Sequence, residues 1–216
     1  MITEFSWNHL NILLLAARWT LLVSLLAFVG GAAGGFVVAL CRTARSAWLR
    51  NACMVYIQIV QGTPVLIVLF LSYYGLSVLG LKLSPMVAAM LAMSVYASAY
   101  LGEIWRGCIE AVAHGQWEAS ASLAMTRWQQ LRHVVLPQAL RLAVPPTVGF
   151  SVQILKNTSI TSVIGVVELT RAGQLINNAT FQPFIVFVTV AVIYFALCFP
   201  LSSAAKRLER KLHVSR

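Results

Sequence analysis

The hydrophobic positions of this chain gather into five long runs separated by shorter polar stretches. The runs cover residues 12–41, 52–79, 85–106, 140–167 and 183–204. A helix that crosses a membrane needs about 20 mainly apolar residues, and each run reaches that length. The pattern therefore predicts an all-α polytopic membrane protein with about five transmembrane helices. Residues 1–216 are expected to form a single transmembrane domain.

The composition favours the same class of protein. Hydrophobic residues make up 59% of the chain and the mean hydropathy is +0.80, whereas soluble domains are roughly 45–50% apolar. The net charge of +10 also fits a nucleic-acid-binding protein, but such a protein needs a solvated basic face. Here the basic residues lie between apolar runs, which is typical of the cytoplasmic loops of a membrane protein.

The distribution of Lys and Arg predicts the orientation of the chain. Basic residues are concentrated after the first run, after the third run and in the C-terminal tail, whereas the opposite loops hold only Lys82 and Arg171. The positive-inside rule places the rich loops in the cytoplasm. We expect the N-terminus outside, the C-terminus in the cytoplasm and an odd number of spans. The N-terminus has neither a basic segment nor a small-residue cleavage site, so we do not expect a removable signal peptide.

The sequence lacks the motifs of an enzyme. It contains no Asp, its four cysteines are widely spaced, and no His lies at metal-ligand spacing. A disulfide framework or metal site is therefore not expected. No nucleotide-binding loop, metalloprotease motif or serine hydrolase motif is present. We expect no catalytic residues, no metal and no cofactor on this chain.

The first run contains two overlapping pairs of small residues, Gly30 with Gly34 and Gly31 with Gly35. Such a face lets two helix backbones approach closely. It indicates either ordinary helix packing with no special partner or a tight contact within the bundle or with another subunit.

The longest polar stretch lies between the third and fourth runs, at residues 115–146. Its first part predicts a short helix opened by Gly115, on which Trp117, Ala121 and Ala124 share one face. A capping box beginning at Thr126 predicts a second short helix, which Pro137 is expected to end. The two helices form either a knob that docks a cytoplasmic partner or an amphipathic segment that lies among the lipid headgroups.

This stretch resembles the "EAA" loop of ABC importer permeases. The matching positions are Glu118, Ala119, Ser120, Ala124, Val134, Leu136 and Pro137. The segments "AYLGEIWRGCIEAV", "QGTPVLIVLFLSYYGL" and "ILKNTSITSVIGVVELTRAG" are more specifically similar to the polar amino acid importers, the histidine, glutamine, arginine and glutamate branch. The resemblance covers roughly residues 10–210.

The resemblance implies the type I ABC importer permease fold and a place in the bacterial inner membrane. It implies a permease subunit of a binding-protein-dependent importer for amino acids. The expected partners are a cytoplasmic ABC ATPase dimer, a second permease that is identical or a sister chain, and an extracytoplasmic amino acid binding protein. ATP and Mg²⁺ would be held by the ATPase. The loop at about residues 114–137 would couple ATPase closure to alternating access, through Trp117, Glu118, Ala119, Ser120, Ala124 and Met125. The competing interpretation is a stand-alone channel or secondary carrier for small polar solutes.

Four positions depart from the family pattern. Ala124 replaces the glycine of the loop, Ser120 replaces the alanine at the third position of the EAA motif, and Gln61 stands where Arg is usual. Asn157 stands where the family usually has Asp. The first two departures are compatible with docking, whereas the last one bears on the type of substrate.

Two polar interruptions inside the apolar runs are candidates for the substrate site. A Gly-x-Pro break at Gly62, Thr63 and Pro64 frees backbone groups at about mid-membrane depth, where irregular backbone marks substrate sites of transporters. A simple proline kink is the alternative. The second interruption follows Lys156, and the resemblance makes Asn157, Thr158 and Ser159 candidates for amino acid binding. Lys156 either pairs with a carboxylate or extends to the membrane surface. Glu103 and Arg106 are expected to form a structural ion pair.

Overall fold

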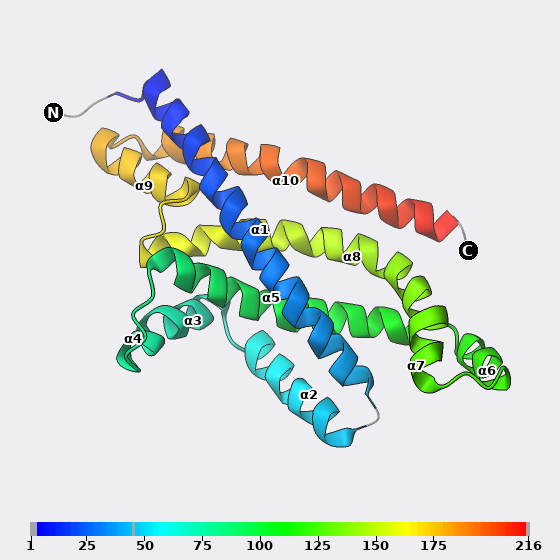
Figure 1. The fold of residues 1–216 in the computed structure, drawn as a ribbon. Coiled ribbons are helices and arrows are strands. Elements are labelled where there is room, and N and C mark those ends of the chain that lie inside the picture. The colour runs from blue at the N-terminus through cyan, green and yellow to red at the C-terminus, as the bar shows by residue number, and fades with distance from the viewer. Residues whose placement is uncertain (1–3, 45, 215–216) are drawn as a thin grey trace.

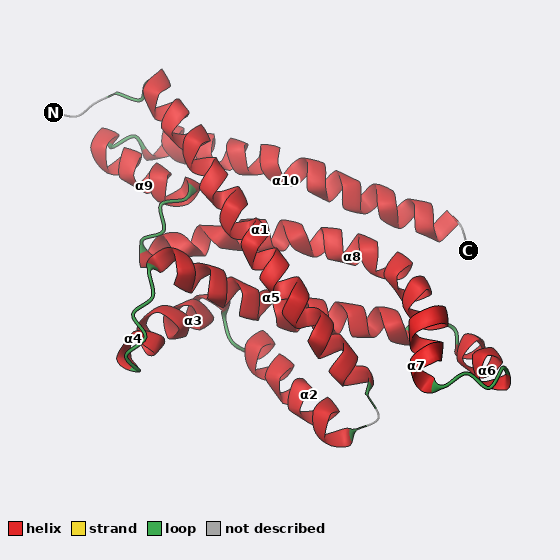
Figure 2. Ribbon diagram, viewed as in Figure 1, coloured by secondary structure: helices red, strands yellow, loops and turns green. Residues whose placement is uncertain are grey.

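The computed structural model describes residues 4–44 and 46–214. Within them, all regular structure is helical (Figures 1 and 2). The elements are α1 (Trp7–Thr43), α2 (Ala47–Gly62), α3 (Val65–Phe70), η1 (Leu71–Gly75), α4 (Leu76–Val78), α5 (Pro85–Glu110), α6 (His114–Ser122), α7 (Arg127–Gln129), η2 (Gln130–Val135), α8 (Leu136–Asn157), η3 (Thr158–Ile164), α9 (Leu169–Thr180) and α10 (Pro183–Val214). The long helices α1, α5, α8 and α10 form the body of the bundle.

Among the described residues, three unbroken helices, α1, α5 and α10, are long and apolar enough to cross a membrane. Two further candidates are bent pairs. The α2 helix meets the α3–α4 segment at 104°, and residues 127–164 meet α9 at 49°. Counting each bent pair as one span gives the five that the hydrophobic pattern predicts. The first bend lies at the predicted Gly62–Pro64 break, and the second follows Ile164, close to the expected end of the fourth run.

The glycines of α1 pack against α5 inside the chain, and Figure 1 shows α1 crossing α5. A Cβ atom built on Gly34 would lie 2.9 Å from the Ser98 Cβ, and one built on Gly35 would lie 3.1 Å from the backbone nitrogen of Gly102. No side chain fits between backbones that approach this closely. Of the interpretations open for this face, the structure shows the intra-bundle contact.

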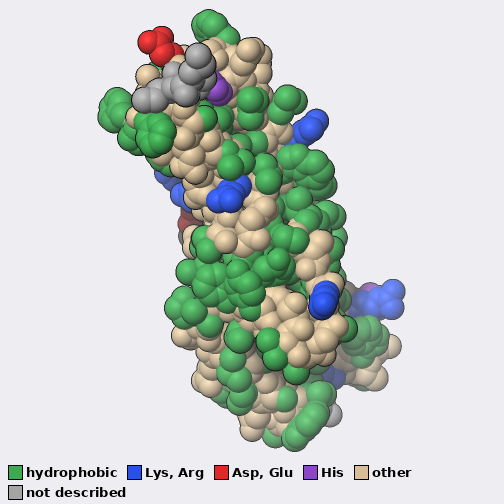
Figure 3. All heavy atoms as spheres, turned by 90° about the vertical axis from the view of Figure 1, so that its left-hand side faces the viewer, with side chains coloured by type: hydrophobic (Ala, Val, Ile, Leu, Met, Phe, Trp, Pro, Cys, Tyr) green, Lys and Arg blue, Asp and Glu red, His purple; other side chains and the backbone are tan. Residues whose placement is uncertain are grey.

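Three hydrophobic clusters hold the bundle together. One joins α1 to α9 and α10 through Leu13, Leu169 and Val186. The others join α1 and α5 to α3 and to α8. Many large hydrophobic side chains stay on the outside, and Figure 3 shows them spread over one flank of the molecule with few charges among them. Such a surface suits contact with lipid.

The chain continues through Pro137 without a break. The expectation that Pro137 would end the second loop helix is wrong, since α7, η2 and α8 follow one another directly. Proline lacks a backbone N–H and so leaves a carbonyl of the preceding turn without its usual donor. The π-helical turn η2 leads directly into α8 at this point, and the Gln138 Nε2 donates to the Val134 carbonyl at 3.0 Å. The loop is therefore continuous with the span that follows it.

Candidate functional site

The α6 helix projects from one end of the bundle, beyond the ends of α5 and α8 (Figure 1). Its base is anchored by a hydrophobic cluster that includes Ile109 of α5, Val135 of η2 and Ala139 of α8, with Trp117 of α6 packed against it. The Gln138 Nε2 also donates to the Gln116 Oε1 at 3.1 Å. Because these contacts join α6 to α8, the two helices are expected to move together.

The end of α6 is closed by a tight turn at the position of the family glycine. Ala124 has a φ of +56°, in the left-handed region that L residues other than glycine rarely adopt. The Ala124 N–H donates to the Ala121 carbonyl, and the Met125 N–H donates to the Ser120 carbonyl. This is the Schellman arrangement, in which glycine is preferred. Ala124 therefore lies beyond α6, and the predicted face shared by Trp117, Ala121 and Ala124 is wrong.

The second part of the loop begins as the sequence predicts. The Thr126 Oγ1 accepts from the Gln129 N–H at 3.4 Å, and the Gln129 Oε1 accepts from the Thr126 N–H at 2.8 Å, which confirms the capping box. The Arg127 guanidinium stacks 4.0 Å from the centre of the Trp117 ring. The buried Gln130 donates to the Met125 carbonyl at 3.0 Å. These contacts fix the second part of the loop against α6.

The outward face of the loop carries one acid among small and apolar residues. Glu118 is 70% exposed, with its Oε1 3.1 Å from the His114 Nδ1. Leu123 is 77% exposed and Trp128 is 59% exposed. A hollow of about 590 Å³ borders Glu118 and Arg127. The combination of a projecting acid, exposed apolar side chains and an adjacent hollow suits contact with another protein.

The six predicted coupling residues divide into two groups. Glu118, Ala119 and Ala124 are exposed and available to a partner. Ser120 is buried, and its Oγ donates to the Trp117 carbonyl at 3.0 Å. Trp117 and Met125 are half-buried. The structure therefore places the first group on the outward face and the second at the base of the loop.

The Gly-x-Pro break lies where the sequence predicts it. The α2 helix ends at Gly62 and α3 begins after Pro64. The Thr63 hydroxyl donates to the Ile59 carbonyl at 2.7 Å, and a Cβ on Gly62 would meet nothing within 4 Å. The bend of 104° between α2 and the α3–α4 segment is much larger than a proline kink within one helix. The structure therefore shows a break between two helices and not the simple kink.

The other predicted substrate segment ends α8 and starts η3. The Thr158 hydroxyl is buried and donates to the Leu155 carbonyl at 2.7 Å, and the Ser159 hydroxyl donates to the Lys156 carbonyl at 2.8 Å. Within the described part of the chain, the half-buried Asn157 side chain has no hydrogen-bond partner. Asn157 is therefore the member of this segment whose polar atoms are available.

The two candidate substrate segments approach each other through their apolar neighbours. Val65, which follows the break, packs on the cluster that contains Phe150 and Ile154 of α8. Leu66 packs on a second cluster together with Ile160 of η3. Across the described residues, no hydrogen bond joins the two segments directly. They border one region of the bundle but do not form a closed site within this chain.

Glu168 is the buried polar residue that sequence reasoning missed. It caps α9 and has an exposed fraction of 0%. Its Oε1 accepts from the Arg171 N–H at 3.0 Å. Its Oε2 accepts from the Thr20 hydroxyl at 3.2 Å and from the Tyr194 hydroxyl at 2.7 Å. Glu168 thus links α1, α9 and α10. An acid immediately before the helix could have indicated the cap, but not its partners on α1 and α10.

The predicted ion pair is present. The Arg106 Nε donates to the Glu103 Oε1 at 2.9 Å, and Arg106 also pairs with Glu110 one turn later. Arg42 of α1 lies 3.9 Å from the Glu103 Oε2. This group of charges joins α1 to α5, which supports the structural role expected for Glu103 and Arg106.

Comparisons with known proteins agree with this geometry. Residues 30–214 match the family described as "Binding-protein-dependent transport system inner membrane component". The chain is 34% identical to the probable amino-acid ABC transporter permease protein YckA of Bacillus subtilis, covering 89% of this chain and 85% of that protein. It is also 34% identical to the glutamine transport system permease protein GlnP of Escherichia coli K12, covering 96% of both chains.

Solved structures share the fold. A chain from the crystal structure of an amino acid ABC transporter with histidines superposes with a TM-score of 0.90 at 31% identity, covering 98% of this chain and all of that one. A chain of the MetNI methionine ABC transporter in an inward-facing conformation superposes with a TM-score of 0.82 at 20% identity, covering 96% of this chain and 99% of that one. The second likeness shows the fold alone.

Proposed function

Because the chain belongs to the family of binding-protein-dependent transport system inner membrane components, we propose that it imports amino acids as the permease subunit of an ATP-driven transporter. Members of the family are multi-pass permeases and are not themselves catalytic. The amino acid substrate is supported by relatives that cover most of the chain and are named as amino acid or glutamine permeases. These comparisons do not favour a stand-alone channel or carrier.

The observation that carries the proposal is the projecting loop around α6. A cytoplasmic ATPase dimer docks there, with Glu118, Ala119 and Leu123 on the contact face. ATP and Mg²⁺ belong to that ATPase. A binding protein delivers the amino acid from the opposite side, and a second permease, identical or a sister chain, completes the pathway. The N-terminus lies outside and the C-terminus lies in the cytoplasm.

The packing of the loop supports a mechanism of coupling. The cluster that holds Trp117 also contains Val135 and Ala139, so a displacement of α6 is transmitted to the start of α8. The 22 residues of α8 span roughly 33 Å at 1.5 Å per residue. Asn157 lies at the far end of this helix. Closure of the ATPase dimer would therefore move the segment that carries Asn157 relative to the Gly62–Pro64 break.

Reversing the charge of Glu118 tests the docking role. Glu118→Lys places a cation on the contact face, and unfavourable charges at an interface cost several kcal/mol. We expect loss of ATPase co-purification or uptake reduced by about tenfold or more, with the permease still correctly folded. Glu4→Lys, which changes an exposed acid at the other end of the chain, serves as the control. Wild-type co-purification and uptake in the Glu118 variant would contradict the docking role.

The side chain of Asn157 points to the class of amino acid. Asn can donate and accept hydrogen bonds but brings no charge, whereas the Asp usual in the family would favour a cation. A hydrogen bond to a charged group contributes about 1.5–3 kcal/mol, compared with about 1 kcal/mol for a neutral pair. We therefore expect a neutral or acidic amino acid, held in this subunit or in its partner.

Competition of unlabelled amino acids with labelled uptake tests this assignment. Asn157→Asp should shift the preference towards cationic amino acids, and Asn157→Leu should weaken apparent affinity. Ser151→Ala on α8, outside the candidate segment, is the matched control, because the Ser151 hydroxyl already donates to the Val148 carbonyl of its own helix. If neither Asn157 variant alters the competition profile or the affinity, Asn157 does not contact the substrate.

A further inference from the structure

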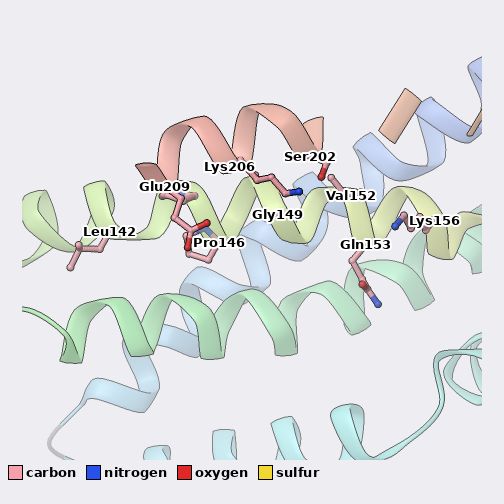
Figure 4. Close-up of a pocket in the computed structure, with 11 residues that line it drawn as sticks. Leu142, Pro146, Gly149, Val152, Gln153, Lys156, Ser202, Lys206 and Glu209 are labelled. Carbon is pink, nitrogen blue, oxygen red and sulfur yellow. The ribbon is translucent and has the colours of Figure 1, made fainter. Parts of the chain in front are cut away.

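A groove of about 570 Å³ runs between α8 and the C-terminal part of α10 (Figure 4). On α8 its lining extends from Leu142 to Lys156, a distance of roughly 20 Å along the helix. On α10 it extends from Ser202 to Glu209. The groove therefore connects the segment that carries Asn157 with the region where α10 approaches its C-terminal end.

Small residues keep this groove open. A Cβ atom added to Gly149 would meet nothing within 4 Å, and Ala205 faces the same space from α10. Pro145 and Pro146 add no long side chain to fill it. Val152 packs with Cys198 and Leu201 of α10, whereas Gly149 and Ala205 leave the space beside this contact unfilled.

Five polar or charged side chains line the groove, and within the described residues they are not bonded to other side chains. They are Gln153, Lys156, Ser202, Lys206 and Glu209. Within residues 4–44 and 46–214, none of these side chains makes a hydrogen bond or an ion pair. By contrast, Glu103, Glu110 and Glu118 each have a cationic or imidazole partner. The groove thus contains several polar groups that are free to form hydrogen bonds or ion pairs with a ligand.

Such a groove is poorly suited to face lipid. Charged side chains within a membrane segment are costly unless they meet water or a compensating group. Lys156 lies one residue from Asn157, inside the fourth apolar run, whereas Lys206 and Glu209 lie beyond the fifth run, at the end of the groove nearest the C-terminus. Polar side chains thus occur along the groove from the membrane segment to the C-terminal tail, which suits an aqueous passage along which a small polar solute moves.

We propose that this groove is a second amino acid site, through which the substrate leaves towards the side of the C-terminus. The proposal rests on the proposed function. The Lys206 ammonium group supplies a donor for the α-carboxylate of the amino acid, and Lys156 supplies another donor at the inner end of the groove. Glu209 supplies an acceptor for its α-ammonium group, and Gln153 and Ser202 offer neutral hydrogen bonds. This combination of donors and an acceptor matches the two charged groups of a zwitterion.

Thiol protection tests the site in the reconstituted permease–ATPase complex. In a variant without its native cysteines, Ala205→Cys places a thiol in the groove, and a membrane-impermeant maleimide is applied from each side in turn. We expect modification from the side of the C-terminus. L-Glutamine or L-glutamate at about ten times the half-protecting concentration should slow it about tenfold. Arg210→Cys, on the exposed surface of α10 outside the groove, should be modified without protection.

A second substitution links the protection to the charges. Lys206→Gln in the Ala205→Cys background should raise the half-protecting concentration of L-glutamate about tenfold, since it removes a charged hydrogen bond. Arg207→Gln, next to it on α10 but outside the lining, should leave that concentration unchanged.

Two results would overturn the site. Failure of the maleimide to reach residue 205 from either side would mean that lipid or the second permease fills the groove. Modification without protection by amino acids would mean that the groove binds none. ATP-driven uptake measured in the same vesicles separates these results from failure of the proposed function, because a complex that imports amino acids but gives no protection contradicts the groove alone.

Discussion

The contact between α1 and α5 and the contact between α8 and α10 both include helical glycines, with opposite results. At the first contact, Gly34 and Gly35 approach the α5 backbone and side chains so closely that no Cβ fits. At the second, Gly149 faces open space in a groove with unpaired polar side chains. The first contact closes the bundle, and the second leaves a passage.

The difference shows that a small residue on a helix can lead either to close helix packing or to an open space. Its role depends on what the facing helix offers. The face of α5 opposite the α1 glycines carries small residues, among them Ala97 and Ser98, so the two backbones come together. The face of α10 opposite Gly149 carries Lys206 and Glu209, whose charged groups resist burial in a dry contact. The chemistry of the partner helix thus decides between closure and a cavity.

Enlarging a glycine of the closed contact should have the largest effect. In Gly31→Leu the side chain would overlap Ala97, including its backbone, and overpacking of this kind costs about 3 kcal/mol. We expect a lower thermal midpoint or loss of the folded permease in detergent. Gly107→Leu on α5, where a Cβ meets nothing within 4 Å, provides the control. Equal stability of the two variants would contradict the close contact.

Removing the buried Glu168 carboxylate should have the next largest effect, because its hydrogen bonds join α1 to α9 and α10. Glu168→Leu leaves the Thr20 and Tyr194 hydroxyls and the Arg171 N–H without their acceptor. Unsatisfied buried groups cost about 1–3 kcal/mol, so we expect a loss of about 2 kcal/mol, measured as a lower unfolding midpoint. Glu168→Gln should recover part of the loss. If both variants melt like the wild type, closure of α1 depends on apolar packing alone.

Ala124 is a third type of position. There glycine is favoured by the positive φ angle of the backbone and not by the space available for a side chain. Ala124→Gly relieves a left-handed conformation that costs an L residue roughly 1–2 kcal/mol. We expect a gain of about 1 kcal/mol, which raises the melting temperature of a chain of this length by about 2–4 °C. Ala121→Gly, inside α6, should lower it. A gain from both variants would mean that flexibility rather than the φ angle is responsible.

The smallest effect is expected in the open groove. Gly149→Ala adds a methyl group that meets nothing within 4 Å, and alanine is the better helix former by about 1 kcal/mol. We expect unchanged or slightly higher stability in the same melting experiment. Gly149→Phe should also fold but should slow uptake, because it fills the passage. A marked loss of stability in Gly149→Ala would show that the groove closes in the membrane.

The interpretation as an ABC permease for amino acids was correct because its motifs are local. The spacing of Glu118, Ala119 and Pro137 needs no tertiary information, and the capping box at Thr126 depends on four consecutive residues. The Gly62–Pro64 break also follows from local backbone chemistry. Element boundaries were less accurate, because η2 carries the helix through Pro137 by means of turns and side-chain bonds that a linear pattern does not contain.

The sequence by itself determined the class of protein, the approximate positions of five spans and the segment that forms the loop, because hydrophobic length, capping and proline act over neighbouring residues. Only the tertiary structure decided that the α1 glycines face α5, that Glu168 meets Thr20 and Tyr194, and that Lys156 shares a groove with Lys206. Thr20 and Glu168 are 148 positions apart in the chain. Such partners depend on how the helices are placed against one another, and a helical periodicity specifies which face is buried but not which helix covers it.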